Sequence, residues 1–215
     1  MPAMTSDFDD RAATWDDDPR KVERARDAAA SIRTAVPLAA DARLLEYGAG
    51  TGLLAEELVD DVGPITLAEP SAGMRDVLAT KVADGRLPGA AIWDLDLARD
   101  PVPDARFDLI ASLMTLHHIP DLAAVLDGFR RLLRDDGVLA VIDLEEDVDR
   151  SFHSEDFDGH HGFDRDRLAG DLHAAGFVEV AFEPCHTITR DTGTYGVFFA
   201  SARRRPDADA PGGTA

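Results

Sequence analysis

Cysteine and lysine are nearly absent from this sequence. Cys185 is the single cysteine among 215 residues, which excludes an intramolecular disulfide and a zinc site built from several cysteines. No stretch approaches the roughly 20 uninterrupted apolar residues that a membrane-spanning helix needs. Residues 1–10 are acidic, where a secretory signal would be basic and then apolar. These absences predict a cytoplasmic protein without membrane contacts.

Positive charge is also scarce. The chain carries 22 Lys and Arg against 42 Asp and Glu, a formal net charge of −20, and Lys21 and Lys81 are the two lysines. A field of this sign repels polyphosphates, so nucleic-acid partners are not expected. We interpret the excess acid as a solvated surface in preference to a patch for a basic partner. The sequence leaves open whether the protein is a monomer or a homodimer.

The order of apolar patterns predicts one α/β domain. A helix is expected over 20–36, after Pro19. Short apolar runs then alternate with helical patterns, which predicts a parallel sheet covered by helices on both faces. The last two runs have no helical pattern between them and should pair antiparallel. The expected strands are 43–47, 65–69, 91–96, 107–112, 138–143, 177–182 and 195–200, and the expected helices or turns are 53–59, 72–82, a piece near Thr115, 122–133 and 164–175.

A glycine-rich turn follows the first expected strand. Gly48, Gly50 and Gly52 alternate with other residues directly before a helical pattern. Glycines let a turn adopt backbone angles closed to other residues and let a ligand lie against the main chain near helix N–H groups. A dinucleotide fingerprint would be G-x-G-x-x-G, but the third glycine here comes one place early. The spacing therefore argues against a nicotinamide or flavin cofactor.

A carboxylate follows the second expected strand. Glu69 lies 21 residues after Gly48. At this distance it reaches the carboxyl edge of the neighbouring strand, where its two oxygens can accept both hydroxyls of a ribose. The glycine turn and Glu69 together predict a nucleoside ligand.

These motifs resemble those of the class I S-adenosylmethionine (SAM)-dependent methyltransferase family, in particular small bacterial enzymes that act on metabolites. The resemblance covers about residues 8–203, and it implies a Rossmann-like seven-stranded sheet, mostly parallel with the last strand antiparallel. Residues 46–52 match the family's E/D-x-G-x-G-x-G loop, and 107–121 match its fourth-strand motif. Asp100 stands where the family has Leu, and Asp135 and Asp136 replace the usual Pro-Gly before strand five.

The resemblance also implies which residues bind SAM, or its product S-adenosylhomocysteine. Glu69 matches the ribose-binding acid and Met74 the residue that covers adenine. Of two nearby acids, Asp94 and Asp96, the alignment selects Asp96 for the adenine amino group, with the Leu97 backbone beside it. The full expected set is Glu46, Gly48, Ala49, Gly50, Gly52, Glu69, Pro70, Met74, Asp96, Leu97, Ser112 and His117.

Histidines are the candidate general bases, because an unperturbed imidazole titrates near neutrality. His117 follows the fourth strand beside His118, and His160 lies in the polar segment 147–162, where this family commonly builds its acceptor pocket. We take His117 and His160 as the catalytic candidates. A metal site of Asp158, His160 and His161 is disfavoured because adjacent histidines point in different directions, so no metal is predicted.

The predicted function is methyl transfer from SAM to a small-molecule acceptor. Two alternatives remain: a protein that binds SAM without catalysis, and, less favoured, an NAD-dependent oxidoreductase. The expected organisation is an N-terminal lid and helix over 1–36, with Phe8, Trp15 and Asp16 in the lid, a SAM-binding domain over 37–203 and a disordered tail over 204–215.

Overall fold

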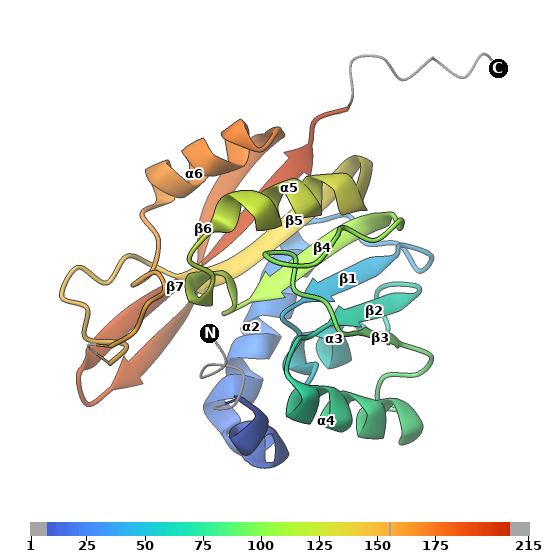
Figure 1. The fold of residues 1–215 in the computed structure, drawn as a ribbon, viewed down its shortest axis with the longest axis horizontal. Coiled ribbons are helices and arrows are strands. Elements are labelled where there is room, and N and C mark those ends of the chain that lie inside the picture. The colour runs from blue at the N-terminus through green and yellow to red at the C-terminus, as the bar shows by residue number, and fades with distance from the viewer. Residues whose placement is uncertain (1–7, 155, 207–215) are drawn as a thin grey trace.

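A single mixed sheet forms the centre of the molecule (Figure 1). The computed structural model describes residues 8–154 and 156–206. Seven strands lie in the order β3-β2-β1-β4-β5-β7-β6. The strands are β1 (Leu44–Tyr47), β2 (Ile65–Ala68), β3 (Ala91–Trp93), β4 (Phe107–Leu113), β5 (Leu133–Leu144), β6 (Phe177–Arg190) and β7 (Gly193–Arg204).

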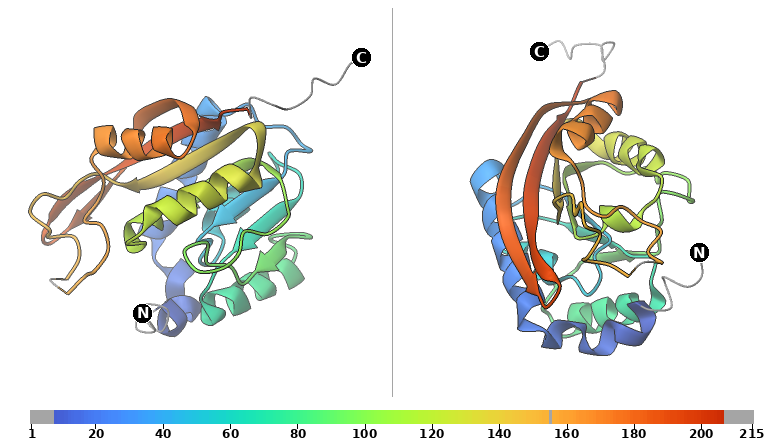
Figure 2. Two further views of the ribbon diagram at one scale, coloured as in Figure 1. Left: turned by 45° about the horizontal axis from the view of Figure 1, so that its top comes forward. Right: turned by 90° about the vertical axis from the view of Figure 1, so that its left-hand side faces the viewer.

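Helices cover both faces of the sheet (Figure 2). Apolar residues of the first three main helices pack in one core cluster, and those of the last two pack in a second cluster on the opposite face. The amphipathic α5, for example, buries Leu122, Val125, Leu126 and Phe129, which recur at helical spacing. The helical elements are η1 (Ala12–Asp17), α2 (Pro19–Ala35), α3 (Leu53–Leu58), α4 (Ala72–Ala83), η2 (Leu116–His118), α5 (Leu122–Leu132) and α6 (Arg165–Ala174).

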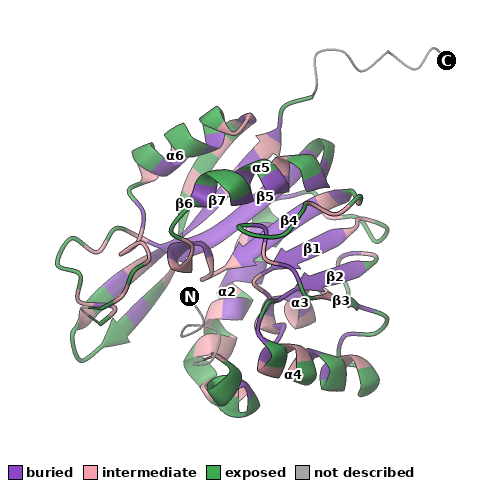
Figure 3. Cartoon of the chain, in the orientation of Figure 1, coloured by how far each residue is buried: buried purple, intermediate pink, exposed green. Residues whose placement is uncertain are grey.

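Two strands of the sheet's interior, β1 and β2, are buried over their whole length. All four residues of β1 and all four of β2 are buried, as Figure 3 shows for the middle of the sheet. Such strands are near-continuous apolar runs because helices cover both of their faces. β1, β2, β3, β4 and β5 pair in parallel, and β7 pairs antiparallel with both β5 and β6. The predicted seven-stranded sheet with an antiparallel last strand is confirmed.

Several strand boundaries differ from the predicted ones. β3 ends at Trp93, three residues before its predicted end. β5 begins at Leu133, five residues early, because the chain leaves α5 directly into pairing with Phe107 of β4. β6 and β7 continue past the predicted strands into a long hairpin that ends at Arg190 and Gly193. Much of β6 is partly or fully exposed, since it is the edge strand, so polar residues there hide the strand from an apolar pattern.

The C-terminal tail was predicted to begin at residue 204, but Arg204 is the last residue of β7. The remainder of that predicted tail, 207–215, lies outside the described residues. In the part of the chain that the structure covers, no helix is both long and apolar enough to cross a membrane.

Candidate cofactor and acceptor site

A cavity of about 640 Å³ lies at the carboxyl ends of β1, β2, β3 and β4. The chain runs from β1 to β2 and β3 on one side and places β4 on the other, so the order of the strands reverses between β1 and β4. Open α/β sheets bind their ligands at this kind of switch point. Loops after the strands form the floor of the cavity, and the N-terminal segment from Phe8 to Arg24 closes one side.

The glycine turn forms part of the floor. Gly48 and Gly50 both have positive φ angles, +69° and +54°. A Cβ on Gly48 would lie 2.2 Å from the Thr115 side chain, whereas a Cβ on Gly50 would meet nothing within 4 Å. Gly48 therefore serves close packing of the loop after β4, and the open space above Gly50 is where a ligand can lie against the backbone.

Glu69 ties the end of β2 to this turn. Its Oε2 accepts the N–H of Gly50 at 2.8 Å, and its Oε1 accepts the N–H of Ser71 at 2.8 Å. Burial raises the pKa of this carboxyl, although both backbone donors favour its charged form. The side chain faces the cavity with its oxygens held in place, as a ribose-binding acid requires.

Glu46 lies beneath the same turn, at the cavity wall. It is 2% exposed, and its Oε2 accepts the N–H of Ala55 in the first turn of α3 at 3.0 Å. Burial raises the pKa of Glu46 to about 8. The carboxyl is thus substantially protonated near neutrality and can donate as well as accept a hydrogen bond.

The opposite end of the cavity carries the residues predicted to hold adenine. Met74 and Asp96 both line it, and so does Asp94, the acid that the alignment rejected. Asp94 pairs with Arg75 at 3.0 Å, whereas an oxygen of Asp96 accepts the N–H of Ala98 at 3.0 Å. Ala49 and Pro70, also predicted from the family motif, line the cavity between its two ends.

Four predicted cofactor residues do not line the cavity: Gly52, Leu97, Ser112 and His117. Gly52 packs against Leu78, which a Cβ would meet at 2.8 Å. The N–H of Leu97 is taken by the Tyr47 hydroxyl at 3.1 Å, and the hydroxyl of Ser112 donates to the Tyr47 carbonyl at 3.1 Å. Gly52, Leu97 and Ser112 therefore contact residues of the cavity wall and of α4 and do not face the cavity themselves.

The N-terminal segment docks on the glycine turn and on the loop after β2. Thr51 donates its hydroxyl to Asp16 at 2.5 Å, and Ser71 donates to Asp9 at 2.6 Å. Lys81, fully buried, binds the same Asp16 at 2.7 Å. Phe8 and Trp15 thereby reach the cavity wall, which is the position expected of a lid.

Two cations line the cavity that the sequence analysis did not select, Lys21 and Arg24. The Nζ of Lys21 lies 3.4 Å from the centroid of the Trp15 ring, a cation–π contact. The Nε of Arg24 is buried without a hydrogen-bond partner among the described residues, and burial lowers the pKa of its guanidinium. The sequence did contain a sign that Arg24 faces inward. Residues four apart lie on the same face of a helix, and Ala28, four residues after Arg24, is buried in the core.

The histidines are divided between two cavities. Of those described, His118 is the one that lines the cofactor cavity; burial and, secondarily, His117 lower its pKa to about 3. The His117 side chain is 2% exposed, and its Nδ1 lies 2.5 Å from Asp143 Oδ1. His160 lines a separate cavity between α5 and α6 and contacts His117 through its backbone, donating its N–H to the His117 carbonyl at 2.7 Å. The two predicted bases therefore do not share the cofactor cavity.

Comparison with known proteins places these features in context. A family model described as a methyltransferase domain matches residues 20–181. A malonyl-[acyl-carrier protein] O-methyltransferase from Geobacter sulfurreducens is 32% identical over 155 residues, which are 65% of this chain and 57% of that protein. An uncharacterized methyltransferase from Geobacillus kaustophilus is 33% identical over 124 residues, 51% of this chain and 56% of that protein.

A solved structure shows the same fold. The 1,6-didemethyltoxoflavin-N1-methyltransferase of Burkholderia thailandensis, bound to its substrate and S-adenosylhomocysteine, matches with a TM-score of 0.73 at 21% identity. The match covers 94% of this chain and 88% of that one. By sequence, the chain spans only 34% to 56% of the length of the first curated relatives that it matches.

Proposed function

The chain belongs to the class I SAM-dependent methyltransferase family, and from this premise we propose that it methylates a small-molecule acceptor at the cavity above the glycine turn. The observation that carries the proposal is the open space above Gly50, bordered by the fixed carboxylate of Glu69. SAM, a nucleoside sulfonium with a ribose and an amino-acid tail, has groups that this floor can bind: its ribose can meet the carboxylate, and its backbone-facing part can lie over the glycine. SAM is the cofactor of the family.

The charges of the cavity complement those of SAM. We assign the ribose hydroxyls to Glu69 and the adenine to Met74 and Asp96. The methionine part of SAM ends in a carboxylate, which needs a cation, and Arg24 and Lys21 offer one on the side of the N-terminal segment. We assign that carboxylate to Arg24, whose Nε has no partner.

Methyl transfer requires an in-line approach of the acceptor to the methyl carbon. The acceptor atom forms a bond to that carbon while the bond from carbon to the sulfonium sulfur breaks, and S-adenosylhomocysteine leaves with a neutral sulfur. The donor is already activated by its positive charge, so the protein's main tasks are to hold the acceptor in line and to take any proton it loses. His118 is the imidazole placed to contact the acceptor, and it is neutral near pH 7 because its pKa is low.

The relatives support a small acceptor. Two of the proteins compared above have names that state the atom methylated. One is an O-methyltransferase and the other is an N1-methyltransferase. We therefore propose an O or N acceptor for this chain, with His117 and His160 acting behind the cavity wall and not as its bases.

Calorimetric titration with SAM, S-adenosylhomocysteine and NAD tests the cofactor. Binding of the two sulfur nucleosides without NAD is the expected result, and a screen of small acceptors with labelled SAM would follow. Binding of NAD alone would refute the proposal and favour an oxidoreductase. Tight SAM binding with no methylated product across O, N, S and C acceptors would favour the alternative of a SAM-binding protein without catalysis.

A further inference from the structure

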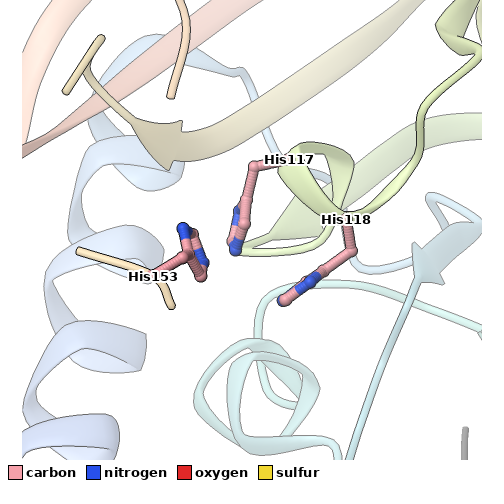
Figure 4. A group of neighbouring side chains, drawn as sticks. All are labelled: His117, His118 and His153. Atoms are coloured by element: carbon pink, nitrogen blue, oxygen red, sulfur yellow. The ribbon is translucent and has the colours of Figure 1, made fainter. Parts of the chain in front are cut away.

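Three histidine side chains converge beside the acceptor side of the cavity. His117 and His118 come from η2, which follows β4, and His153 comes from the loop after β5; Figure 4 shows the three rings turned toward one another. One nitrogen from each ring lies within 4.8 Å of the other two. We propose that His117, His118 and His153 form a binding site for a divalent transition-metal ion such as Zn²⁺. The site goes beyond the proposed methyl transfer and does not depend on it; in the metal-bound protein His118 would serve as a ligand and not as a base.

A buried carboxylate orients the first of these rings. Asp143 Oδ1 lies 2.5 Å from His117 Nδ1, and the second oxygen of Asp143 accepts the His117 backbone N–H at 3.3 Å. A carboxylate on Nδ1 fixes the orientation of the His117 ring and leaves Nε2 as the nitrogen available to a metal. Metal-binding histidines are held in this way in proteins.

The other two rings carry buried nitrogens that no described group satisfies. His118 Nδ1 and His153 Nδ1 both lack a hydrogen-bond partner. An unsatisfied buried polar atom is costly and calls for an explanation, such as an ion. A metal ion bound by these nitrogens would satisfy them, because an imidazole binds a metal through the lone pair of a ring nitrogen.

The surroundings suit a ligand cage. His153 stacks on Phe157 with ring centroids 3.8 Å apart, and Phe8 meets the edge of His118 at 5.4 Å. This apolar shell limits the freedom of both imidazoles and excludes water from one side. In the sequence, the site was hidden because adjacent histidines were expected to diverge, whereas the short turn of η2 brings the rings of His117 and His118 to 4.1 Å.

The spacing of the three nitrogens is close to that of a zinc site. Zn–N bonds of about 2.0–2.1 Å put two nitrogens of a tetrahedron about 3.4 Å apart, so small side-chain rotations from a separation of 4.8 Å close the site. Three histidines leave a fourth coordination position free, and one of them, His118, lines the cofactor cavity. Hard cations such as Mg²⁺, which prefer oxygen ligands, are disfavoured at a site of three imidazoles.

Titration of the tag-free, chelator-treated protein with Zn²⁺ tests the site, with Co²⁺ absorption to report the geometry. We expect one tight site per chain, with the absorption of a tetrahedral complex. His153→Ala should weaken Zn²⁺ binding by at least about 100-fold, and Asp143→Asn by about 10–100-fold, as is typical of a residue that orients a ligand. His173→Ala, which removes an exposed histidine of α6, is the matched control and should bind Zn²⁺ as the parent does.

SAM titration of each variant serves as the check on folding, since the cofactor residues lie elsewhere in the cavity. Zn²⁺ binding that is equal in the parent and in His153→Ala would assign the ion to surface acids and overturn the proposal. No stoichiometric binding by a parent protein that still binds SAM would overturn it as well. Failure to bind SAM with an intact Zn²⁺ site would instead refute the proposed function and leave the metal site standing.

Discussion

The buried Nε of Arg24, which has no hydrogen-bond partner among the described residues, gives the sharpest test of how SAM lies in the cavity. Arg24 is assigned to the methionine carboxylate, which is the one anionic group of SAM. Replacing it by Gln keeps a side chain of similar reach and removes the charge. The variant should bind SAM more weakly and should bind 5′-methylthioadenosine, which has the same nucleoside and no carboxylate, as the parent does.

The magnitude follows from the kind of contact. Hydrogen bonds to a charged group contribute about 1.5–3 kcal/mol, and about 1.4 kcal/mol corresponds to a factor of ten in affinity, so SAM affinity should fall by about 10–150-fold. Lys21 lines the same side of the cavity and can take over part of the contact, which favours the lower end of that range. Raising the salt concentration should reduce the difference in SAM affinity between the parent and the Arg24→Gln variant, because salt screens the charge of the guanidinium.

Calorimetry with both ligands is the assay, and Arg26→Gln is the matched control. Arg26 lies on the same helix, but its side chain is 65% exposed and pairs with Glu57, away from the cavity. Equal losses of SAM and methylthioadenosine affinity in Arg24→Gln would show that the variant disturbs the cavity as a whole. Unchanged affinity for both would refute the assignment of the carboxylate.

Five further changes test other parts of the protein. Glu69→Ala should lower SAM affinity by about 10–100-fold through lost ribose contacts, and Gly50→Arg should abolish binding by filling the space above the turn; unchanged calorimetric affinity in both would reject the site. Glu46 has a folded-state pKa of about 8 against an ordinary value of 4.5, so its contribution to stability is lost as the pH rises between these values, and Glu46→Gln should raise Tm above pH 8 but not below pH 4.5; a pH-independent difference in thermal melts would contradict the value. Lys81→Met should cost about 1–3 kcal/mol in urea unfolding, because two partly exposed carboxylates lose their buried partner. His118→Gln should leave SAM affinity within about twofold while lowering turnover by about 100-fold or more, and full turnover would remove this imidazole from the reaction.

The sequence predicted those parts of the fold that local patterns encode. Interior strands such as β1 and β2 are apolar throughout, and the turn with Gly48 and Gly50 lies within a few residues of the first strand, so both could be located without tertiary information. The edge hairpin of β6 and β7 could not, because pairing between the two strands, and not burial, extends it to Arg190. Leu97 illustrates a second limit: its backbone N–H was expected beside adenine, but the hydroxyl of Tyr47, fifty residues earlier, takes it.

The acceptor side of the cavity lay beyond prediction for a different reason. The groups beside it come from segments that are distant in sequence: His118 of η2 lines the cavity, whereas Asp143 of β5 and His153 of the following loop contact the two histidines of η2 without lining it. His118 lies within the recognised fourth-strand motif, but no motif marks Asp143 or His153. They come together because β4 and β5 pair in parallel, so the carboxyl ends of both strands lie at the same edge of the sheet, next to the N-terminal segment.

Net charge was equally uninformative about this region. The chain carries a formal charge of −20, yet the end of the cavity near the N-terminal segment presents Lys21 and Arg24. The excess of acid is therefore not uniform: acids such as Asp16 and Asp18 pair with neighbouring cations around the segment, while Arg24 is left with an unpartnered Nε. A local cation without a partner inside an acidic protein selects strongly for an anionic group, because any competing surface site repels it. The carboxylate of SAM meets that requirement, and its binding at Arg24 would direct the methionine end of the cofactor toward the N-terminal segment.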